Sequence, residues 1–191
     1  MENIKRILTG LNIEPIKQKL NAHPEWWDEI TVRQDHPGSY HKDTQTIYLI
    51  GPVAFTVQDV YCNLGLMNYP HFADFEQDLE SLSTSIIQAA HLTQGGRVML
   101  VKLKPGGFIH LHVDEGPYAE HFSRFHIPIV TNKRCSLAVQ NNHQETEMAL
   151  MGEGELWWFN HRTHHMAHNG GSEDRVHLII DAVSEKFPVV N

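Results

Sequence analysis

Helical spacing of hydrophobic residues is clearest in one segment of the first half of the chain. In residues 74–92 the apolar side chains recur at the period of a helix, about 3.6 residues. Asp74 is expected to cap the start of this helix, and Gly95-Gly96 lies just past its predicted end. The first twenty residues predict one or two further short amphipathic helices. The pattern therefore predicts supporting helices at the N-terminus and in mid-chain.

The second half of the chain has the pattern of a β-protein. Short apolar or alternating segments are separated there by turn residues: "RVMLVKLKPGG", "FIHLHVD", "SRFHIPIVT", "CSLAVQ", "TEMALMGEG", "ELWWFN" and "DRVHLIIDAV". Residues 46–57 add an earlier segment that resembles two strands joined at Gly51-Pro52. Closely spaced strands with glycine-rich turns are typical of a sandwich or barrel. We predict a mainly β chain, a jelly roll with helical support, as a single domain over 1–191.

One predicted strand carries unusual polar residues. In "GGFIHLHVDEG", strict alternation places His110, His112 and Asp114 on the face opposite to Ile109 and Leu111. Two histidines and one carboxylate on one face of an octahedron leave three coordination positions open, as in non-haem Fe(II) oxygenases. The competing interpretation of the His-x-Asp triplet is a solvated pair that arose by chance.

The second histidine of such a metal site has to come from a distant part of the chain. Fifteen histidines are present, and nine of them fall between His110 and His168. The segment "FNHRTHHMAHNGG" offers four candidates, which these residues alone do not separate: His161, His164, His165 and His168.

Two arginines stand in segments that are otherwise apolar. Arg175 begins "RVHLIIDAV", and burial of an unpaired guanidinium costs several kcal/mol. It therefore lies at the exposed end of the strand or pairs with an anion. In "SRFHIPIV", Arg124 and His126 share one face, and apolar residues take the other. Two arginines and a histidine near a metal would suit a small dicarboxylate.

Composition argues against some classes of protein. A formal net charge of −8 argues against broad nucleic-acid binding, and the charged N-terminus has no apolar run typical of a signal peptide or membrane span. Cys62 and Cys135 are interpreted as two buried thiols in a reducing cytosol, with one disulfide as the alternative. We expect a cytoplasmic protein without nucleic-acid or membrane partners.

Five segments, taken in order, resemble the aspartyl/asparaginyl β-hydroxylase family of Fe(II)- and 2-oxoglutarate-dependent oxygenases. They are "PGGFIHLHVDEGP", "SRFHIPI", "GEGELWWFN", "HMAHN" and "DRVHLIIDAV". The resemblance covers about residues 95–183. It implies a double-stranded β-helix, a cupin-like jelly roll, whose core occupies 94–184 and carries the metal site. Residues 1–93 would form a supporting region of helices and strands.

The resemblance also implies roles for single residues. His112 and Asp114 match the first two iron ligands. The family's pattern of a histidine followed, four positions later, by an asparagine falls on "HMAHN", which selects His165 as the distal ligand. Asn169 ends that pattern, and Asn169 and His110 could orient the ligands from behind.

Three further matches concern the cosubstrate. Arg175 matches the arginine that grips a carboxylate of 2-oxoglutarate, and Arg124 and His126 match an Arg-x-His motif that also contacts it. No side chain is expected to act as a catalytic residue beyond the metal ligands.

The activity implied is an Fe(II)-dependent dioxygenase that takes 2-oxoglutarate and O2 as cosubstrates. It would hydroxylate an unactivated C–H bond of an amino acid, a peptide side chain or a related small amine, and form succinate. The main alternative is a cupin-like metal protein with another chemistry, such as a Zn or Mn isomerase or lyase. A third is a non-catalytic jelly roll. The acidic and aromatic loop "DEGPYAEHF" suggests an amine-bearing substrate, whereas the position hydroxylated and the oligomeric state are not encoded in any motif.

Overall fold

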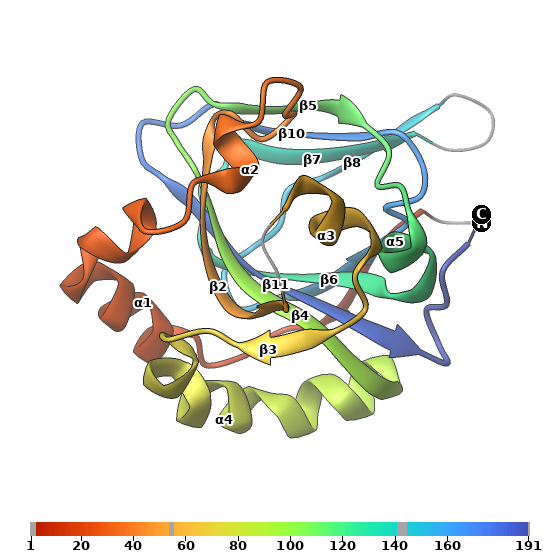
Figure 1. Cartoon of the computed structure of the whole chain (residues 1–191), viewed down its shortest axis with the longest axis horizontal. Helices are drawn as coiled ribbons and strands as arrows, with labels where there is room; N and C mark the ends of the chain where they lie inside the picture. The colour runs from red at the N-terminus through yellow and green to blue at the C-terminus, as the bar shows by residue number, and fades with distance from the viewer. Residues whose placement is uncertain (1–2, 54–55, 141–144, 191) are drawn as a thin grey trace.

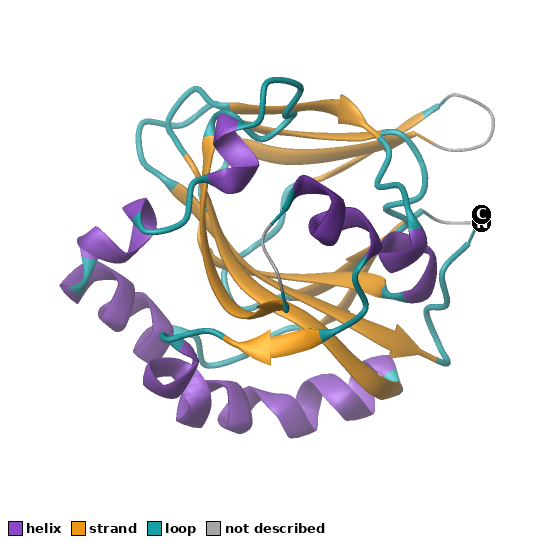
Figure 2. Cartoon of the chain, in the orientation of Figure 1, coloured by secondary structure: helices purple, strands orange, loops and turns teal. Residues whose placement is uncertain are grey.

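The computed structural model describes residues 3–53, 56–140 and 145–190, which form two facing β-sheets with helices around them (Figures 1 and 2). The strands are β1 (Ile4–Leu8), β2 (Thr44–Pro52), β3 (Leu66–Asn68), β4 (Leu92–Leu103), β5 (Phe108–His112), β6 (Ser123–Val130), β7 (Cys135–Gln140), β8 (Thr146–Ala149), β9 (Leu156–Phe159), β10 (His165–Asn169) and β11 (Arg175–Ser184). The larger sheet has the order β1-β9-β6-β11-β4-β2-β3, and the smaller has the order β5-β10-β7-β8. This mainly β architecture confirms the predicted jelly roll.

Helices surround the two sheets, and two of them, α1 (Glu14–Ala22) and α4 (Phe72–Ala90), cover the outer face of the larger sheet. The others are the 3₁₀ turn η1 (Pro24–Asp28), α2 (Val32–Asp35), α3 (Val57–Cys62) and α5 (Pro117–His121). Figure 1 shows α1 and α4 along that face, and their buried residues share one apolar core with Phe125, Ile127 and Ile129 of β6. Because strand side chains alternate, Arg124 and His126 point into the space between the sheets, as predicted.

The N-terminal helix prediction is wrong for its first residues. The segment Ile4–Leu8 is strand β1, which pairs antiparallel with β9 and closes one edge of the larger sheet. Helical structure begins only at Glu14, where Pro15 occupies the first turn. Pairing with a partner strand here outweighs a weak local preference for helix.

The mid-chain helix is confirmed, but its ends differ from the prediction. It starts at Phe72 after His71, so Asp74 lies within the first turn instead of capping it. His91 ends it in the left-handed conformation (φ 50°), and Gly95-Gly96 belongs to β4. A Cβ on Gly96 would lie 2.7 Å from the Asp181 carbonyl oxygen, so glycine is required there for close packing.

The expected pair of strands in residues 46–57 is one strand, β2, which ends at Pro52. Residues 54–55 lie outside the described part of the chain, and α3 begins at Val57. Thr56 and Asp59 form a reciprocal capping box at its start, a local signal for helix.

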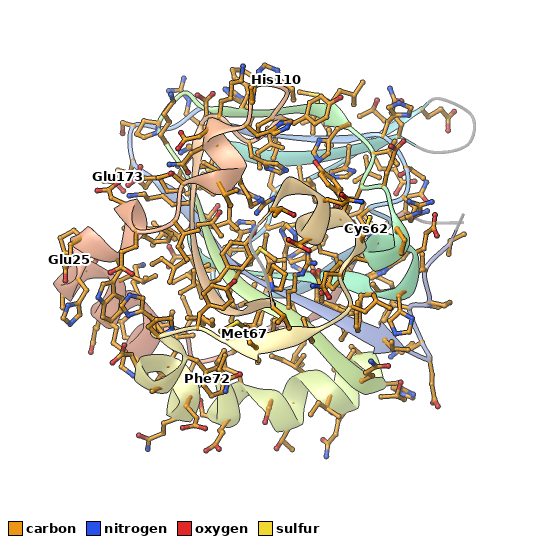
Figure 3. All side chains as sticks on the ribbon, in the orientation of Figure 1. Glu25, Cys62, Met67, Phe72, His110 and Glu173 are labelled. Atoms are coloured by element: carbon orange, nitrogen blue, oxygen red, sulfur yellow. The ribbon has the colours of Figure 1, made fainter. Side chains whose placement is uncertain are left out.

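The two cysteines differ in their exposure to solvent. Both cysteines are free; Cys135 is buried as predicted, whereas Cys62 is exposed at the end of α3 (Figure 3), so the prediction of a buried thiol is wrong there. In the part of the chain that the structure describes, no helix has the length and hydrophobicity needed to span a membrane.

Candidate metal centre

His112, Asp114 and His165 meet at the end of the smaller sheet. His112 ends β5 and His165 begins β10, and the two are paired directly across the antiparallel ladder. The Oδ1 atom of Asp114 lies 3.4 Å from His112 Nε2 and 4.0 Å from His165 Nε2. One ligand atom from each residue lies within 4.8 Å of the others. Octahedral ligands with bonds of about 2.1 Å are about 3 Å apart, so small shifts would close this group on a cation.

A β-bulge delivers His112 to this position. The β5–β10 register pairs His165 with His112 but Ala167 with Ile109, so β5 has one extra residue between the pairs. Ile109 and His112 therefore both face inward, whereas His110 and Leu111 are both exposed, and Figure 3 shows His110 on the outside of the molecule. The strict alternation expected from the sequence is wrong at this point.

Hydrogen bonds orient both imidazoles. His112 Nδ1 donates to the carbonyl oxygen of His110 at 2.7 Å, and His165 Nδ1 donates to that of Thr163 at 2.9 Å. In the neutral form, each ring therefore presents an unprotonated Nε2 toward the other two side chains, which is the form that binds a metal. Burial lowers the pKa of His165 to about 4, although Asp114 opposes the shift, so this ring is neutral at physiological pH.

An ion-pair network holds the carboxylate. Arg124 Nη1 donates to Asp114 Oδ2 at 2.5 Å, and its Nε and Nη2 donate to the two oxygens of Asp181 at 2.8 and 3.1 Å. Burial acts to raise the pKa of Asp114, but Arg124 and His112 outweigh it and hold that pKa well below its ordinary value. Asp114 is thus ionised and fixed in place. The backbone of Asp114 is fixed as well, because its N–H donates to the carbonyl oxygen of His161 at 3.1 Å.

A small inner cavity of about 40 Å³ lies behind these ligands. Arg175 and His126 line it from the larger sheet, and His165 lines it from the smaller. Arg175 is 3% exposed, and among the described residues it has no carboxylate partner; its Nη2 donates to His177 Nδ1 at 3.0 Å. Burial lowers the pKa of Arg175 to about 10, which leaves it charged at neutral pH.

A larger outer cavity of about 600 Å³ opens in front of the ligands. Its wall includes Arg33, Glu115 and several tyrosines. The Tyr40 ring is stacked on His112 with ring centres 5.0 Å apart, and His41 meets the same ring edge-on at 5.3 Å. A segment of the first 93 residues therefore forms part of the site, although no motif there predicts it.

The other three candidate histidines do not join this group of ligand atoms. His161 is buried and its Nε2 donates to the Ala119 carbonyl at 3.0 Å, which gives it a structural role. His164 is exposed and lines the outer cavity, and His168 stacks on Phe108 with ring centres 4.1 Å apart.

The two residues expected behind the ligands also differ from each other. Asn169 is fully buried and its Nδ2 donates to the carbonyls of Leu103, Lys104 and Glu173, so it ties β10 to the turns before β5 and β11. It touches neither His112 nor His165. His110 contributes through its backbone carbonyl and not through its exposed ring.

Two inward residues of β11 were missed. His177 and Asp181 follow Arg175 at intervals of two and six, so the alternation of that strand carried the signal for both. Arg33, Tyr40 and His41 gave no comparable signal, because only tertiary packing brings them to the metal ligands.

The family is decided by comparison with known sequences. The model of the family described as aspartyl/asparaginyl beta-hydroxylase matches residues 26–185, most of the chain. The chain belongs to this family. Among curated relatives, L-proline cis-4-hydroxylase of Rhizobium meliloti (strain 1021) is 30% identical over 89 residues. These residues are 47% of this β-hydroxylase family chain but only 30% of that relative.

Solved structures support the fold of this family member. A prolyl-4-hydroxylase of Pseudomonas putida has a TM-score of 0.55 at 9% identity, over 97% of this chain and 94% of that one. HygX of Streptomyces hygroscopicus, solved with nickel and 2-oxoglutarate bound, has a TM-score of 0.57 at 10% identity, over 99% and 85%. The fold is the double-stranded β-helix of the 2-oxoglutarate and Fe(II) oxygenases.

Proposed function

We propose that this protein is an Fe(II)- and 2-oxoglutarate-dependent hydroxylase, with His112, Asp114 and His165 as its metal ligands. The observation that carries the proposal is that a group of metal-binding side chains and a buried, unneutralised cation lie on two sides of one cavity. A three-ligand face with open coordination positions lies on one side, and the buried cation Arg175 lies on the other. A buried guanidinium without an anion is costly, so its natural partner is an anionic ligand.

Charge supports a dianionic ligand between them. The formal charges of Asp114, Asp181, Arg124, Arg175, a divalent cation and a dicarboxylate sum to zero. 2-Oxoglutarate meets this requirement, because its 2-oxo acid end can reach the metal while the far carboxylate pairs with Arg175. Bound iron would supply the activation of O2 that an unactivated C–H bond requires.

Cosubstrate entry requires movement of the wall between the cavities. The inner cavity of about 40 Å³ has room for about three water molecules, which is too little for a five-carbon diacid. Arg33 and His41 line both cavities. They would move aside when 2-oxoglutarate enters, and together with Tyr40 they would then exclude water from the metal.

The contacts of Arg124 and His126 refine their expected roles. All three nitrogen groups of Arg124 donate to Asp114 or Asp181, so its first role would be to hold the metal-binding carboxylate. His126 lines the inner cavity and is suited to contact the cosubstrate. A direct contact of either residue with 2-oxoglutarate stays a prediction.

A free amino acid is the substrate class that suits the outer cavity. Its wall carries both signs of charge, on Arg33 and Glu115, beside aromatic side chains. A small zwitterion would pair its carboxylate with the first and its ammonium group with the second. The relative named L-proline cis-4-hydroxylase makes L-proline the first compound to test. We expect this chemistry in the cytoplasm, where two free cysteines stay reduced.

The test is succinate formation by protein purified without oxygen, loaded with Fe(II) and 2-oxoglutarate and then exposed to air. L-Proline and other amino acids should stimulate succinate release, and His112→Ala should abolish both iron binding and turnover. His168→Gln is the matched control, because His168 lies on the same strand as His165 but lines neither cavity. Normal turnover by His112→Ala would refute the ligand assignment.

The main rival, a cupin-like Zn or Mn isomerase or lyase, makes a different prediction. N-Oxalylglycine should compete with 2-oxoglutarate at the metal only if the protein is an oxygenase. The rival also gives no reason for an unneutralised Arg175 behind the ligands.

A further inference from the structure

His177 lies directly behind the inner cavity and contacts two of its walls. It is 1% exposed, on β11 two residues after Arg175, and it lines neither cavity. Its Nδ1 lies 3.0 Å from Arg175 Nη2 and 3.1 Å from His126 Nδ1. One nitrogen atom therefore joins two side chains that face the space between the sheets.

The chemistry of these three groups fixes the direction of both hydrogen bonds. A guanidinium can only donate, so His177 Nδ1 accepts from Arg175. His126 Nδ1 faces the same lone pair, so it must carry a proton and donate as well. His177 is then protonated on Nε2, and His126 has its lone pair on Nε2.

The neutral state that this arrangement needs is favoured by its surroundings. Burial lowers the pKa of His177 well below its ordinary value, and the neighbouring Arg175 and His126 lower it further. The lone pair on Nδ1 is thus available throughout the neutral pH range.

A packing role alone does not explain an imidazole at this position. His177 Nε2 is buried and has no hydrogen-bond partner among the described residues, which is unfavourable for a polar atom. An apolar side chain would fill the same space between β4 and β6 without that penalty. The benefit that remains to the imidazole is the acceptor at Nδ1.

We propose that His177 is a positioning residue, whose Nδ1 acceptor holds Arg175 in the geometry that receives the far carboxylate of 2-oxoglutarate. The inference rests on the proposed function. Because Arg175 has no carboxylate of the protein to anchor it, the only fixed partner for its guanidinium before cosubstrate arrives is this ring nitrogen, within the part of the chain described. Loss of the acceptor would leave the guanidinium free to adopt other rotamers.

Two substitutions separate the acceptor from the volume of the ring. His177→Asn can place an amide oxygen close to the position of Nδ1, whereas His177→Phe keeps a ring but has no acceptor. Binding would be measured by calorimetry on Ni(II)-loaded protein, which binds without turnover. The ligands are 2-oxoglutarate and 2-oxobutyrate, which has the same 2-oxo acid end but no second carboxylate.

We expect His177→Phe to weaken 2-oxoglutarate binding by about 10–100-fold and to leave 2-oxobutyrate binding within about twofold. His177→Asn should restore most of the affinity for 2-oxoglutarate. Equal losses for both ligands, or equal affinities of the Phe and Asn variants, would overturn the proposal. If wild-type protein bound 2-oxoglutarate no better than 2-oxobutyrate, the proposed function would fail together with this inference. If only the inference about His177 fails, wild-type protein still binds 2-oxoglutarate more tightly than 2-oxobutyrate.

A measurement without substitutions covers the case in which His177→Phe does not fold. In zinc-loaded protein labelled with ¹⁵N-histidine, NMR should show His177 protonated on Nε2 and His126 on Nδ1. The opposite tautomer of His177 would remove the acceptor and overturn the proposal.

Discussion

Arg124 and Arg175 lie on neighbouring strands and line the same inner cavity, but their partners are opposite in kind. Arg124 donates to two carboxylates, that of the partly buried Asp114 and that of the buried Asp181. Arg175 donates to a neutral ring nitrogen of His177 and has no carboxylate partner among the described residues. The first charge is neutralised within the protein, and the second is left for a ligand. Under the proposed function, Arg124 would hold the metal-binding carboxylate in place and Arg175 would bind the anionic cosubstrate.

The largest effect on stability is expected at the neutralised arginine. Arg124→Met would leave the partly buried Asp114 and the buried Asp181 without their cation, which should cost about 3–5 kcal/mol in the free energy of unfolding. Urea titration of metal-free protein would measure it. Arg6→Met is the control, because its ion pair with Glu155 is half exposed and should contribute less than about 1 kcal/mol. If Arg124→Met lowered the free energy of unfolding no more than Arg6→Met does, Arg124 would not have the structural role that distinguishes it from Arg175.

The opposite result is expected at the second arginine. Arg175→Met removes a buried cation and leaves no carboxylate without its partner, so the free energy of unfolding should stay the same or increase. The affinity for 2-oxoglutarate should fall by about 10–150-fold, since a charge-assisted contact contributes about 1.5–3 kcal/mol. Calorimetry on the Ni(II)-loaded variant measures this loss. Destabilisation comparable to that of Arg124→Met would show that Arg175 has a structural partner.

A smaller effect is expected from the pH dependence of stability. The pKa values of His126 and His177 are lowered by burial and by nearby arginines, so below about pH 6.5 the unfolded chain binds more protons than the folded one. These histidines therefore do not reduce stability above that pH. As the pH falls below it, the free energy of unfolding decreases.

Each such histidine can lower the free energy of unfolding by at most about 1.4 kcal/mol per pH unit. His177→Asn removes one of them, so its stability should depend less steeply on pH between 7 and 5.5 than that of wild type. Parallel curves from urea titrations of the two metal-free proteins would contradict a neutral His177 in the fold.

The smallest change in stability is expected at a third arginine, in the outer cavity. Arg33 is only partly buried and donates to Met99 Sδ at 3.6 Å and to His41 Nε2 at 3.0 Å. Arg33→Met should therefore change the free energy of unfolding by less than about 0.5 kcal/mol. It should raise the KM of a carboxylate-bearing substrate. A large loss of stability would instead place Arg33 with Arg124 among the structural arginines.

The residues of the candidate metal site could be singled out because their signal is local. His112 and Asp114 are two residues apart, and the family pattern selects His165 from four neighbouring histidines, which the geometry then brings to the same point. The bulge in β5 was not predictable, since an extra residue in a ladder leaves no mark in hydrophobic alternation. Strand β10 was also not predictable from the hydrophobic pattern, because its inward residues, His165, Ala167 and Asn169, give no apolar stripe.

Contacts between distant segments explain the remaining differences. Arg33, Tyr40 and His41 reach the ligands only through tertiary packing, and β1 is a strand only because β9 pairs with it. By contrast, Asp181 could have been found from the alternation that places it on the same face of β11 as Arg175.

The most direct measurement is the anomalous diffraction of crystals grown with Mn(II) and 2-oxoglutarate without oxygen. The account predicts one strong peak within bonding distance of His112 Nε2, His165 Nε2 and a carboxylate oxygen of Asp114, with the far carboxylate of the cosubstrate on Arg175. A manganese peak at any other group of side chains, or a cosubstrate carboxylate remote from Arg175, would contradict it.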